Sequence, residues 1–450
     1  MIIDELRGKI IKYAAAQAMV WKDICYSYHD INVLIEKYSL VIKDRRMAGE
    51  SVAIIGDYSP YTVALFIALL QHGCVVLPLS NRSEYTVSEF CKVVELQHSI
   101  QFESDGKLIY SKIGHVQMND LMIKFRKKNH PGVVIFSSGS TGVSKAILHD
   151  AFPLLEKFRV NRKCVRAISF LLFDHIGGIN TLFYTLFNGG CLVIPDDRSV
   201  IAVCQAIERH KVEALTTTPT FLNLLLLSQS TDSYCLESLR VINYGTEIMP
   251  EFLLLKLHDL FPEVRLSQAY GLSEVGVLPV RSISPTSSLI KIDESDEFNI
   301  RICNGMLEVK SKSSMVGYLN CENTMADGGW FKTGDLVEEY GDCLKILGRK
   351  SDIINVGGSK VYPAEVENVL RQIDNVEDVL VFPISNLITG NIVAAKFRLS
   401  EPEDLMSFHG RMIKFCKPKL SNYKIPQKID FTSDIFHGER FKKTRITGVI

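Results

Sequence analysis

The sequence lacks the marks of several protein classes. No apolar run in its 450 residues approaches the length of a membrane-spanning helix, and residues 1–7 carry acid where a signal peptide carries base. Lysine plus arginine equals aspartate plus glutamate at 51 each, so no net field attracts nucleic acid or an anionic membrane. These absences predict a soluble, cytoplasmic protein that binds neither nucleic acid nor membrane.

Paired cysteines and metal-ligand clusters are also missing. The 11 cysteines are scattered from Cys25 to Cys416 without a C-x-x-C pair, and their odd number argues against a complete disulfide framework. No group of His, Cys and Asp residues has the spacing of a zinc site. We therefore expect reduced cysteines that lie in the core.

Residues 133–145 join a buried-strand pattern to a run of small, hydroxylated residues. Glycines in this run let backbone N–H groups face an anion, serines and a threonine add hydroxyl donors, and Lys145 adds a point charge. The spacing is not that of a Walker loop, because the lysine stands three residues after Gly142 and no hydroxyl follows it. A surface Ser/Gly turn is the alternative. The predicted phosphate-binding residues are Ser137, Ser138, Gly139, Ser140, Thr141, Gly142 and Lys145.

Strand and helix patterns alternate along the first half of the chain. Residues 52–57 and 74–79 are apolar runs of strand length, and residues 61–70 between them carry apolar side chains at helical spacing. A strand, a helix and a strand at this pitch predict a parallel βαβ unit. The alternation continues at 191–195, 215–221 and 241–247.

The last hundred residues have the pattern of a small α/β unit. Pro363 stands where a helix takes its first residue, and residues 379–383 and 392–397 have the composition of strands. Two helical stripes accompany them, which are Val366, Val369, Leu370 and Ile373, and then Leu405, Phe408, Met412 and Phe415. We expect the second stripe to be core.

Several longer motifs follow the Ser/Gly-rich loop. They are Phe-Asp-His-Ile-Gly-Gly at 173–178, Ser-Gln-Ala-Tyr-Gly-Leu-Ser-Glu at 267–274, Gly-Gly-Trp-Phe-Lys-Thr-Gly-Asp-Leu at 328–336, the run 347–367 that begins Leu-Gly-Arg-Lys-Ser-Asp, and Leu-Ser-Asn-Tyr-Lys-Ile-Pro at 420–426. With the loop, and in this order, they resemble the adenylate-forming superfamily of acyl- and aryl-CoA synthetases, peptide-synthetase adenylation domains and luciferases. The resemblance covers the chain nearly end to end.

The resemblance implies an α/β fold with two domains. A large N-terminal domain, residues 1–349, has sheets built from βαβ units and a β-rich subdomain, and binds the nucleotide and the acid. The hinge consists of Lys350, Ser351 and Asp352. Residues 353–450 then form a small, mobile α+β lid that carries the catalytic lysine.

The resemblance also assigns the nucleotide site. Tyr270 offers a ring to adenine, Gly271 permits close approach, Ser273 bonds the α-phosphate, and Glu274 supplies a hard oxygen to Mg²⁺. Asp335 and Arg349 are expected at the ribose, and Tyr244 and Gly245 at the adenine and acyl pockets. A helix-start Ser-x-Glu and an Asx-turn are the alternatives for the two motifs.

The acid pocket and the catalytic lysine are less clearly marked. His175 is expected beside the carboxylate and Ala269 beside the acyl group, whereas Asp174 would hold the ammonium of an amino acid. A core histidine is the alternative. Where the family has Thr-x-x-Gly-Lys-x-x-Arg, this chain has Phe441 in place of the glycine, which makes Lys442 the catalytic candidate and Lys443 the second choice. A basic, solvated tail is the alternative.

The implied reaction joins an acid to a thiol. ATP with Mg²⁺ would activate a carboxylic acid, aromatic or small, to an acyl-adenylate. CoA, or the phosphopantetheine of an acyl or peptidyl carrier protein, would then accept the acyl group, with Gly357 and Gly358 admitting the thiol arm. The alternatives are a stand-alone amino-acid or fatty-acid adenylating enzyme, a P-loop phosphotransferase, and a noncatalytic nucleotide-binding relative. Phe441 and the shortened 81–130 region motivate the last of these.

Overall fold

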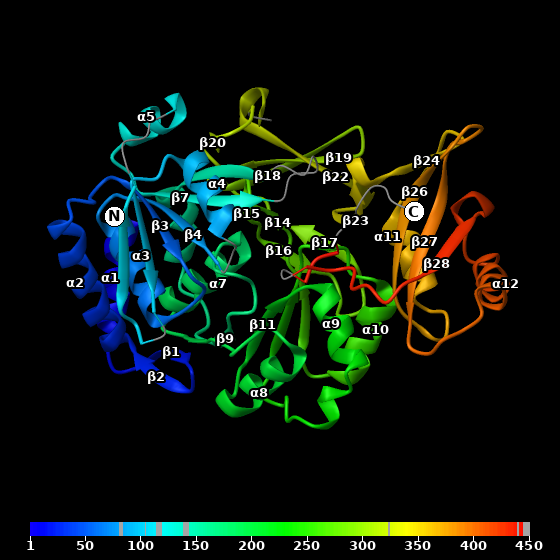
Figure 1. Ribbon diagram of the computed structural model, residues 1–450, viewed down its shortest axis with the longest axis horizontal. Helices are drawn as coiled ribbons and strands as arrows, with labels where there is room; N and C mark the ends of the chain where they lie inside the picture. The colour runs from blue at the N-terminus through cyan, green and yellow to red at the C-terminus, as the bar shows by residue number, and fades with distance from the viewer. Residues whose placement is uncertain are drawn as a thin grey trace.

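The computed structural model describes residues 1–80, 84–103, 105–113, 119–137, 144–322, 325–438 and 441–443. Helices and strands alternate along the chain, and the N-terminal and C-terminal elements lie at opposite ends of the molecule (Figure 1). The helices are α1 (Ile2–Lys12), α2 (Tyr28–Asp44), α3 (Pro60–Gln71), α4 (Glu84–Val94), α5 (Asp120–Arg126), α6 (Ala151–Glu156), α7 (Ile176–Phe187), α8 (Val200–His210), α9 (Pro219–Leu227), α10 (Glu251–Leu260), α11 (Pro363–Leu370) and α12 (Leu405–Cys416).

Two seven-stranded sheets form most of the larger part, the first mixed and the second mainly parallel. The first runs β6 (Leu108–Lys112), β5 (His98–Phe102), β3 (Ser51–Ile55), β4 (Val75–Leu79), β7 (Gly132–Ser137), β8 (Lys145–Asp150) and β20 (Gly317–Tyr318). The second runs β2 (Ile24–Ser27), β1 (Gln17–Trp21), β10 (Cys191–Val193), β9 (Arg166–Ile168), β11 (Ala214–Thr217), β12 (Val241–Tyr244) and β13 (Arg265–Gln268). Because β3 and β4 pair in parallel across α3, the predicted βαβ unit is confirmed.

An antiparallel sheet follows the second of these sheets in the chain. It runs β16 (Val280–Ser282), β17 (Leu289–Ile292), β23 (Cys343–Arg349), β22 (Trp330–Tyr340), β19 (Met306–Ser311) and β18 (Phe298–Cys303), with β21 (Met325–Ala326) beside β22. A short hairpin, β14 (Gly271–Leu272) and β15 (Gly276–Val277), precedes it. This hairpin carries residues 271–274 of the motif at 267–274, β22 carries residues 330–336 of the motif at 328–336, and β23 carries residues 347–349.

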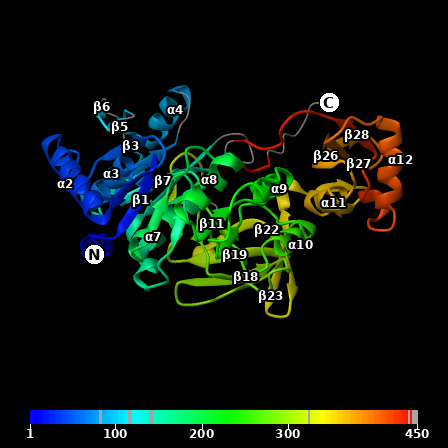
Figure 2. The ribbon, with the colours of Figure 1, turned by 90° about the horizontal axis from the view of Figure 1, so that it is seen from below.

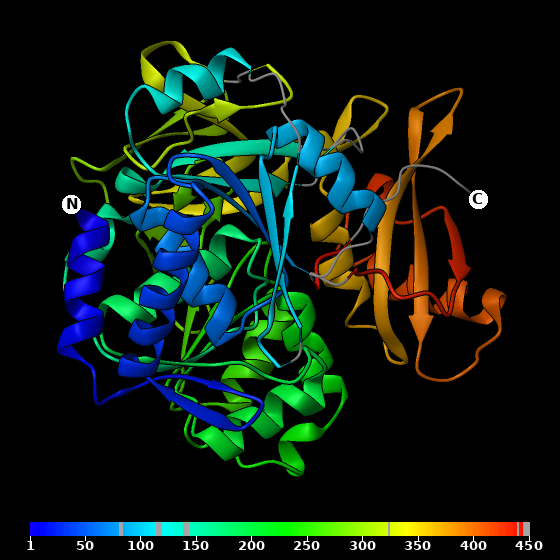
Figure 3. The ribbon, with the colours of Figure 1, turned by 60° about the vertical axis from the view of Figure 1, so that its left-hand side comes forward.

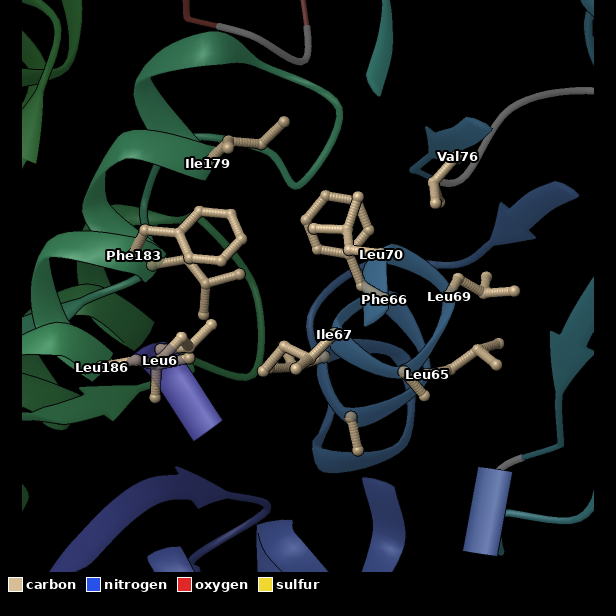
Figure 4. Close-up of a cluster of buried hydrophobic side chains, with 14 of the residues drawn as sticks. Leu6, Leu65, Phe66, Ile67, Leu69, Leu70, Val76, Ile179, Phe183 and Leu186 are labelled. Carbon is tan, nitrogen blue, oxygen red and sulfur yellow. The ribbon is translucent and has the colours of Figure 1, made fainter. Parts of the chain in front are cut away.

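The main core packs around α3. Ten of its twelve residues are buried, from Pro60 to Leu70, so the helix is apolar on all sides, as expected of a central helix. Figure 4 shows Phe66 and Ile67 of α3 beside Phe183 and Leu186 of α7 and Leu6 of α1. The N-terminus of α3 is capped by Ser59, whose hydroxyl accepts a hydrogen bond from the amide of Thr62.

The C-terminal unit has a sheet and a core of its own. Its strands are β25 (Ser359–Val361), β24 (Ile354–Val356), β27 (Gly390–Leu399), β26 (Val376–Asn386) and β28 (Lys428–Phe431). Helices α11 and α12 pack on it, and the unit stands beside the larger part in Figure 2 and Figure 3. Pro363 is the first residue of α11, and the predicted strands lie within β26 and β27.

Two expectations need correction. Phe408 and Met412 are buried and Phe415 packs beside them, but Leu405, the first residue of α12, is 38% exposed and is not part of the core. All 11 cysteines are free thiols, but the expectation that they are core residues is wrong for four exposed ones, which are Cys25, Cys164, Cys235 and Cys321. Among the described residues, no helix is long and apolar enough to cross a bilayer.

Candidate active site

A pocket of about 180 Å³ lies where the sheets of the larger part meet the C-terminal tail. Its walls draw on residues from 137 to 442, so segments far apart in the sequence converge there. The lining residues are Ser137, Lys145, Phe170, Leu171, Leu172, His175, Ile176, Arg198, Thr246, Gly271, Leu272, Ser273, Glu274, Arg349, Phe441 and Lys442. The pocket thus has one apolar wall and several cationic side chains.

The two ends of the predicted phosphate-binding loop line the pocket. Ser137 and Lys145 are paired across the antiparallel strands β7 and β8, so these two ends lie side by side. The Lys145 ammonium lies 5.0 Å from the centre of the Tyr318 ring. The other predicted members, Ser138, Gly139, Ser140, Thr141 and Gly142, lie outside the described residues.

Ser273 and Glu274 occupy the turn between β14 and β15. The Tyr318 hydroxyl donates to Glu274 Oε1 at 2.8 Å. Behind the turn, His149 Nε2 donates to the Ser273 carbonyl at 2.6 Å. Burial is the main reason that the pKa of His149 falls to about 4, so its imidazole is neutral near pH 7. A Cβ on Gly271 would lie 2.6 Å from the Gly276 carbonyl oxygen, and therefore the hairpin requires glycine there.

Tyr270 and Asp335 bond each other close to this turn. The Tyr270 hydroxyl donates to Asp335 Oδ2 at 2.7 Å, and Arg349 Nε lies 3.5 Å from Asp335 Oδ1. Burial raises the pKa of Asp335, although Tyr270 and Arg349 oppose this effect. Of these three residues Arg349 lines the pocket, whereas Tyr270 and Asp335 are buried beside it.

Tyr244, Gly245 and Ala269 form a tight backbone crossing next to the pocket. The Ala269 amide donates to the Tyr244 carbonyl at 2.7 Å. A Cβ on Gly245 would lie 2.5 Å from the Ala269 carbonyl oxygen, so this close approach also requires glycine. The next residue, Thr246, has a φ of 70° and is the one from this segment that lines the pocket.

The apolar wall lies on the β9–α7 connection. His175 is the N-cap of α7, where its Nδ1 accepts from the Gly177 amide at 3.1 Å, and its side chain lines the pocket. Asp174 is 2% exposed and is not a lining residue within the described part of the chain. Arg198 completes this side, with Nη1 lying 2.6 Å from Asp57 Oδ2 and Nε donating to the Phe170 carbonyl at 2.5 Å.

The two candidate lysines have different surroundings. Lys442 lines the pocket, and its pKa is lowered, first by the burial of its side chain within the site and second by the nearby Arg349. Lys443 is 9% exposed, and its ammonium lies 3.1 Å from Asp378 and 3.6 Å from Glu367. Burial opposes ionisation of Asp378, but Lys443 and Arg371 outweigh it and lower the pKa of Asp378 to about 2. Lys443 is therefore held in an ion cluster away from the pocket.

The predicted hinge and thiol residues lie outside the pocket lining of the described chain. Lys350, Ser351 and Asp352 form a single 3₁₀ turn directly after β23. Gly357 and Gly358 form the turn between β24 and β25, with φ values of 56° and 87°. Such a turn needs two residues of positive φ, which glycine supplies without strain.

Sequence reasoning did not identify Arg198, Thr246, Phe170 or Tyr318. Arg198 follows Asp196 and Asp197 in a segment without a motif, and its partner Asp57 is distant in the sequence. The positive φ of Thr246 has no sequence signal. Within the described residues, no group of three or more His, Cys, Asp or Glu side chains is arranged to hold a metal ion.

Residues 9–289 match the model of a protein family described as AMP-binding enzyme. The chain belongs to the AMP-binding enzyme family. This membership confirms the predicted superfamily and the predicted enzyme class, an ATP-dependent, AMP-forming acid–thiol ligase.

Relatives of this AMP-binding enzyme align over nearly its whole length. The chain is 27% identical to 2-succinylbenzoate–CoA ligase of Bacillus pumilus, with 93% of this chain and 91% of the relative covered. It is 25% identical to indoleacetate–CoA ligase of Aromatoleum aromaticum, with 91% and 90% covered. VraA of Staphylococcus epidermidis, provisionally named a long chain fatty acid–CoA ligase, is 24% identical, with 99% and 97% covered.

Solved structures share the fold. The anthranilate CoA ligase AuaEII, in complex with anthranoyl-AMP, has a TM-score of 0.84 at 17% identity, with 98% of this chain and 95% of that chain covered. The o-succinylbenzoate CoA synthetase MenE of Bacillus subtilis, in complex with OSB-AMP, has a TM-score of 0.75 at 21% identity, with 98% and 99% covered. The predicted α/β fold class is therefore confirmed.

Proposed function

We propose that this AMP-binding enzyme joins a carboxylic acid, aromatic or small, to the thiol of CoA through an acyl-adenylate. The observation that carries the proposal is the composition of the pocket. Lys145, Arg198, Arg349, Lys442 and Glu274 line one cavity together with the apolar side chains of the β9–α7 connection. Such a cavity suits a polyanion and an acid with an apolar body, and the CoA ligases among the relatives support this choice.

The cationic side chains of the pocket would reduce the charge repulsion that opposes adenylation, the first step of the proposed reaction. An acid carboxylate must approach a triphosphate, and two like charges about 4 Å apart repel by about 4 kcal/mol at an effective dielectric near 20. The ammonium groups of Lys145 and Lys442 lie on the walls of the same pocket and would offset that repulsion. We assign Lys442, rather than Lys443, as the catalytic lysine, since Lys443 is already paired with Asp378.

The proposed reaction has two displacements. A carboxylate oxygen attacks the α-phosphorus of ATP, the new O–P bond forms, and the bond to the bridging oxygen breaks with release of pyrophosphate. The thiol sulfur then attacks the acyl carbon, AMP leaves with the bonding electron pair, and the thiol proton passes to solvent. No side chain of the enzyme acts as a nucleophile in this scheme.

Glu274 is the proposed protein ligand for Mg²⁺. Its carboxylate lines the pocket, and Tyr318 bonds one of its two oxygens, so the donor type and place fit a hard cation. Mg²⁺ is usually held by one or two carboxylates together with substrate phosphates, which agrees with a single carboxylate here. When bound, the ion would neutralise phosphate charge as pyrophosphate leaves.

The other nucleotide roles remain proposals from the resemblance. Ser137 and Ser273 would bond phosphate oxygens, Gly271 would allow the nucleotide to approach, and Arg349 with Asp335 would meet the ribose. Because the Asp335 carboxylate is bonded to Tyr270, ribose binding would require Asp335 to exchange this hydrogen bond or share it. Tyr244, Gly245 and Ala269 would lie near the adenine and the acyl group. Of this segment Thr246 is the residue that lines the pocket and would contact them.

The lining of the pocket suits a compact acid. Phe170, Leu172, Ile176 and Phe441 give it a partly aromatic surface, and we expect the carboxylate of the acid beside His175. A free amino acid fits the pocket less well, because Asp174, the residue expected to bind its ammonium group, is buried and is not among the lining residues of the described chain. A fatty acid is the alternative that one relative supports.

Domain movement and the acceptor belong to the same proposal. The lid, residues 353–450, would turn about 350–352 after adenylation, so that Gly357 and Gly358 admit the thiol arm of CoA or of a carrier protein. The separate core of the C-terminal unit is compatible with movement as one body. A cytoplasmic location, expected from the sequence, stays a prediction.

The experiment that tests the proposal measures both products. The purified enzyme is incubated with ATP, Mg²⁺ and CoA and with a panel of aryl, short-chain, fatty and amino acids, and the products are measured by mass spectrometry. The proposal predicts acyl-CoA and AMP in equal amounts, best with a compact aromatic acid. Release of ADP instead of AMP, or thioester formation only on a phosphopantetheinylated carrier protein, would contradict it.

A further inference from the structure

The residue that departs from the family pattern, Phe441, makes contacts that glycine could not make. After β28 the tail runs back from the C-terminal unit toward α9 (Figure 1). There the Phe441 ring lies 5.3 Å from the Phe170 ring and 5.6 Å from the Phe221 ring, between centroids. The His437 ring stacks on it at 5.1 Å. These contacts join the tail to the apolar core beneath the second sheet.

The backbone at Phe441 is in a conformation that favours glycine. Its φ is 49°, in the left-handed region, where a bulky side chain is disfavoured. The Thr218 hydroxyl donates to the Phe441 carbonyl at 2.8 Å, and the Phe441 amide donates to the Gly438 carbonyl at 2.9 Å. The local geometry is thus the one that suits glycine, and the aromatic contacts offset the cost of a side chain.

A second attachment lies on the other side of Lys442. The Lys443 amide donates to Glu247 Oε1 at 2.5 Å, and Glu247 Oε2 in turn accepts from the Thr220 hydroxyl at 2.6 Å. The Lys443 ammonium meanwhile pairs with Asp378 in the C-terminal unit. Lys442 is therefore the residue between two attachments to the larger part, and its side chain is directed to the pocket.

We propose that Phe441 is a positioning residue that latches the tail onto Phe170 and Phe221 and thereby places Lys442 in the pocket for adenylation. The proposal rests on the function proposed above and deepens it. Since Phe441 and Phe170 also line the pocket, the latch closes the wall that the acid contacts. The latch belongs to the first step, because the thiol step would follow release of the tail.

The test compares three variants. Phe441→Gly removes the ring and leaves a residue that adopts the left-handed φ without strain, so the fold should persist. Phe441→Tyr keeps the ring contacts. Phe415→Leu, on α12 and away from the pocket, is the matched control for loss of a partly buried ring.

Three measurements separate positioning from mere stability. Acid-dependent ATP–pyrophosphate exchange should lose about 10²-fold in kcat for Phe441→Gly, the size of effect that misplacement of a catalytic group by about 1 Å produces. The KM for ATP should change little. Thioester formation from acyl-adenylate supplied directly should be retained. Hydrogen exchange of the tail peptide containing 441–443 should be faster in Phe441→Gly alone.

Each outcome decides the proposal. Fast tail exchange without loss of adenylation in Phe441→Gly would show that the ring holds the tail but does not place Lys442, and would overturn the proposal. Unchanged tail exchange would overturn the latch itself. An inactive wild-type enzyme whose tail is protected would instead overturn the proposed function, and the positioning role with it. Rescue of adenylation in Phe441→Tyr supports the latch.

Discussion

Lys442 and Lys443 are neighbours in the chain with opposite environments. Lys442 is open to the pocket, whereas Lys443 is 9% exposed and faces Asp378 and Glu367, which are 11% and 4% exposed. Removing one cation from a buried cluster leaves its carboxylate partners with less compensation. Lys443 is therefore part of an ion cluster, whereas Lys442 is the proposed catalytic lysine.

Replacement of each lysine by alanine separates these roles. Lys442→Ala should reduce ATP–pyrophosphate exchange by about 10²–10³-fold, as loss of one preorganised donor does. Lys443→Ala should reduce the free energy of unfolding by about 3 kcal/mol, somewhat less than for an isolated buried pair because Arg371 still neutralises Asp378. Exchange kinetics and urea unfolding of the two variants measure this. Exchange that survives in Lys442→Ala would remove the assignment.

The sequence favoured Lys442 over Lys443, because only Lys442 stands three residues before Arg445, but it could not show how their surroundings differ. The residues that hold Lys443, Glu367 and Asp378, are more than sixty positions away in the chain. That Lys145 and Glu274 line one pocket could be predicted from the sequence, since each lies in a motif. The place of Arg198 in the pocket could not be predicted, because the residues around it in the chain form no motif.

Among the elements, β8 supports the turn that carries Ser273 and Glu274. Its His149 is fully buried and donates to the Ser273 carbonyl. Since burial lowers the pKa of His149 to about 4, the native protein keeps the imidazole neutral where an unfolded chain, with an ordinary value near 6.5, binds a proton. Acid therefore favours the unfolded state at this position.

A pH series of unfolding tests this. The stability that neutral His149 contributes is fully present above pH 6.5 and should fall by about 3 kcal/mol as the pH drops toward 4, where the folded protein also becomes protonated. His149→Gln keeps a donor for Ser273 and should remove that part of the pH dependence. Replacement of the exposed His29 by Gln is the control. Equal slopes for His149→Gln and wild type would contradict the account.

Elements were predicted best where periodicity was strong. The helical spacing at 61–70 and the proline at 363 correspond to α3 and α11. The prediction that Leu405 is a core residue was wrong, because helical spacing predicts which face of a helix is apolar but not whether its first residue is covered. The hairpin of β14 and β15 was not predicted, since its tight crossing at Gly271 depends on Gly276 and its carbonyl.

At the scale of the whole molecule, the pocket is a meeting point rather than a property of one unit. The larger part supplies Lys145, His175 and Glu274, and the tail that follows the C-terminal unit supplies Phe441 and Lys442. The order of the motifs along the chain predicted that the larger part and the tail contribute to one site. The distances between them depend on sheet packing, which local patterns do not encode.

The most direct test of the central claim is acid-dependent exchange of pyrophosphate into ATP, with Mg²⁺ and without any thiol. The account predicts exchange that requires both the intact enzyme and one class of acid, and that falls in Lys442→Ala. Exchange isolates the adenylating step, because it needs only reversible cleavage of ATP at the α-phosphorus. Tight binding of ATP with no exchange for any acid of the panel would contradict the account and identify a nucleotide-binding protein without this chemistry.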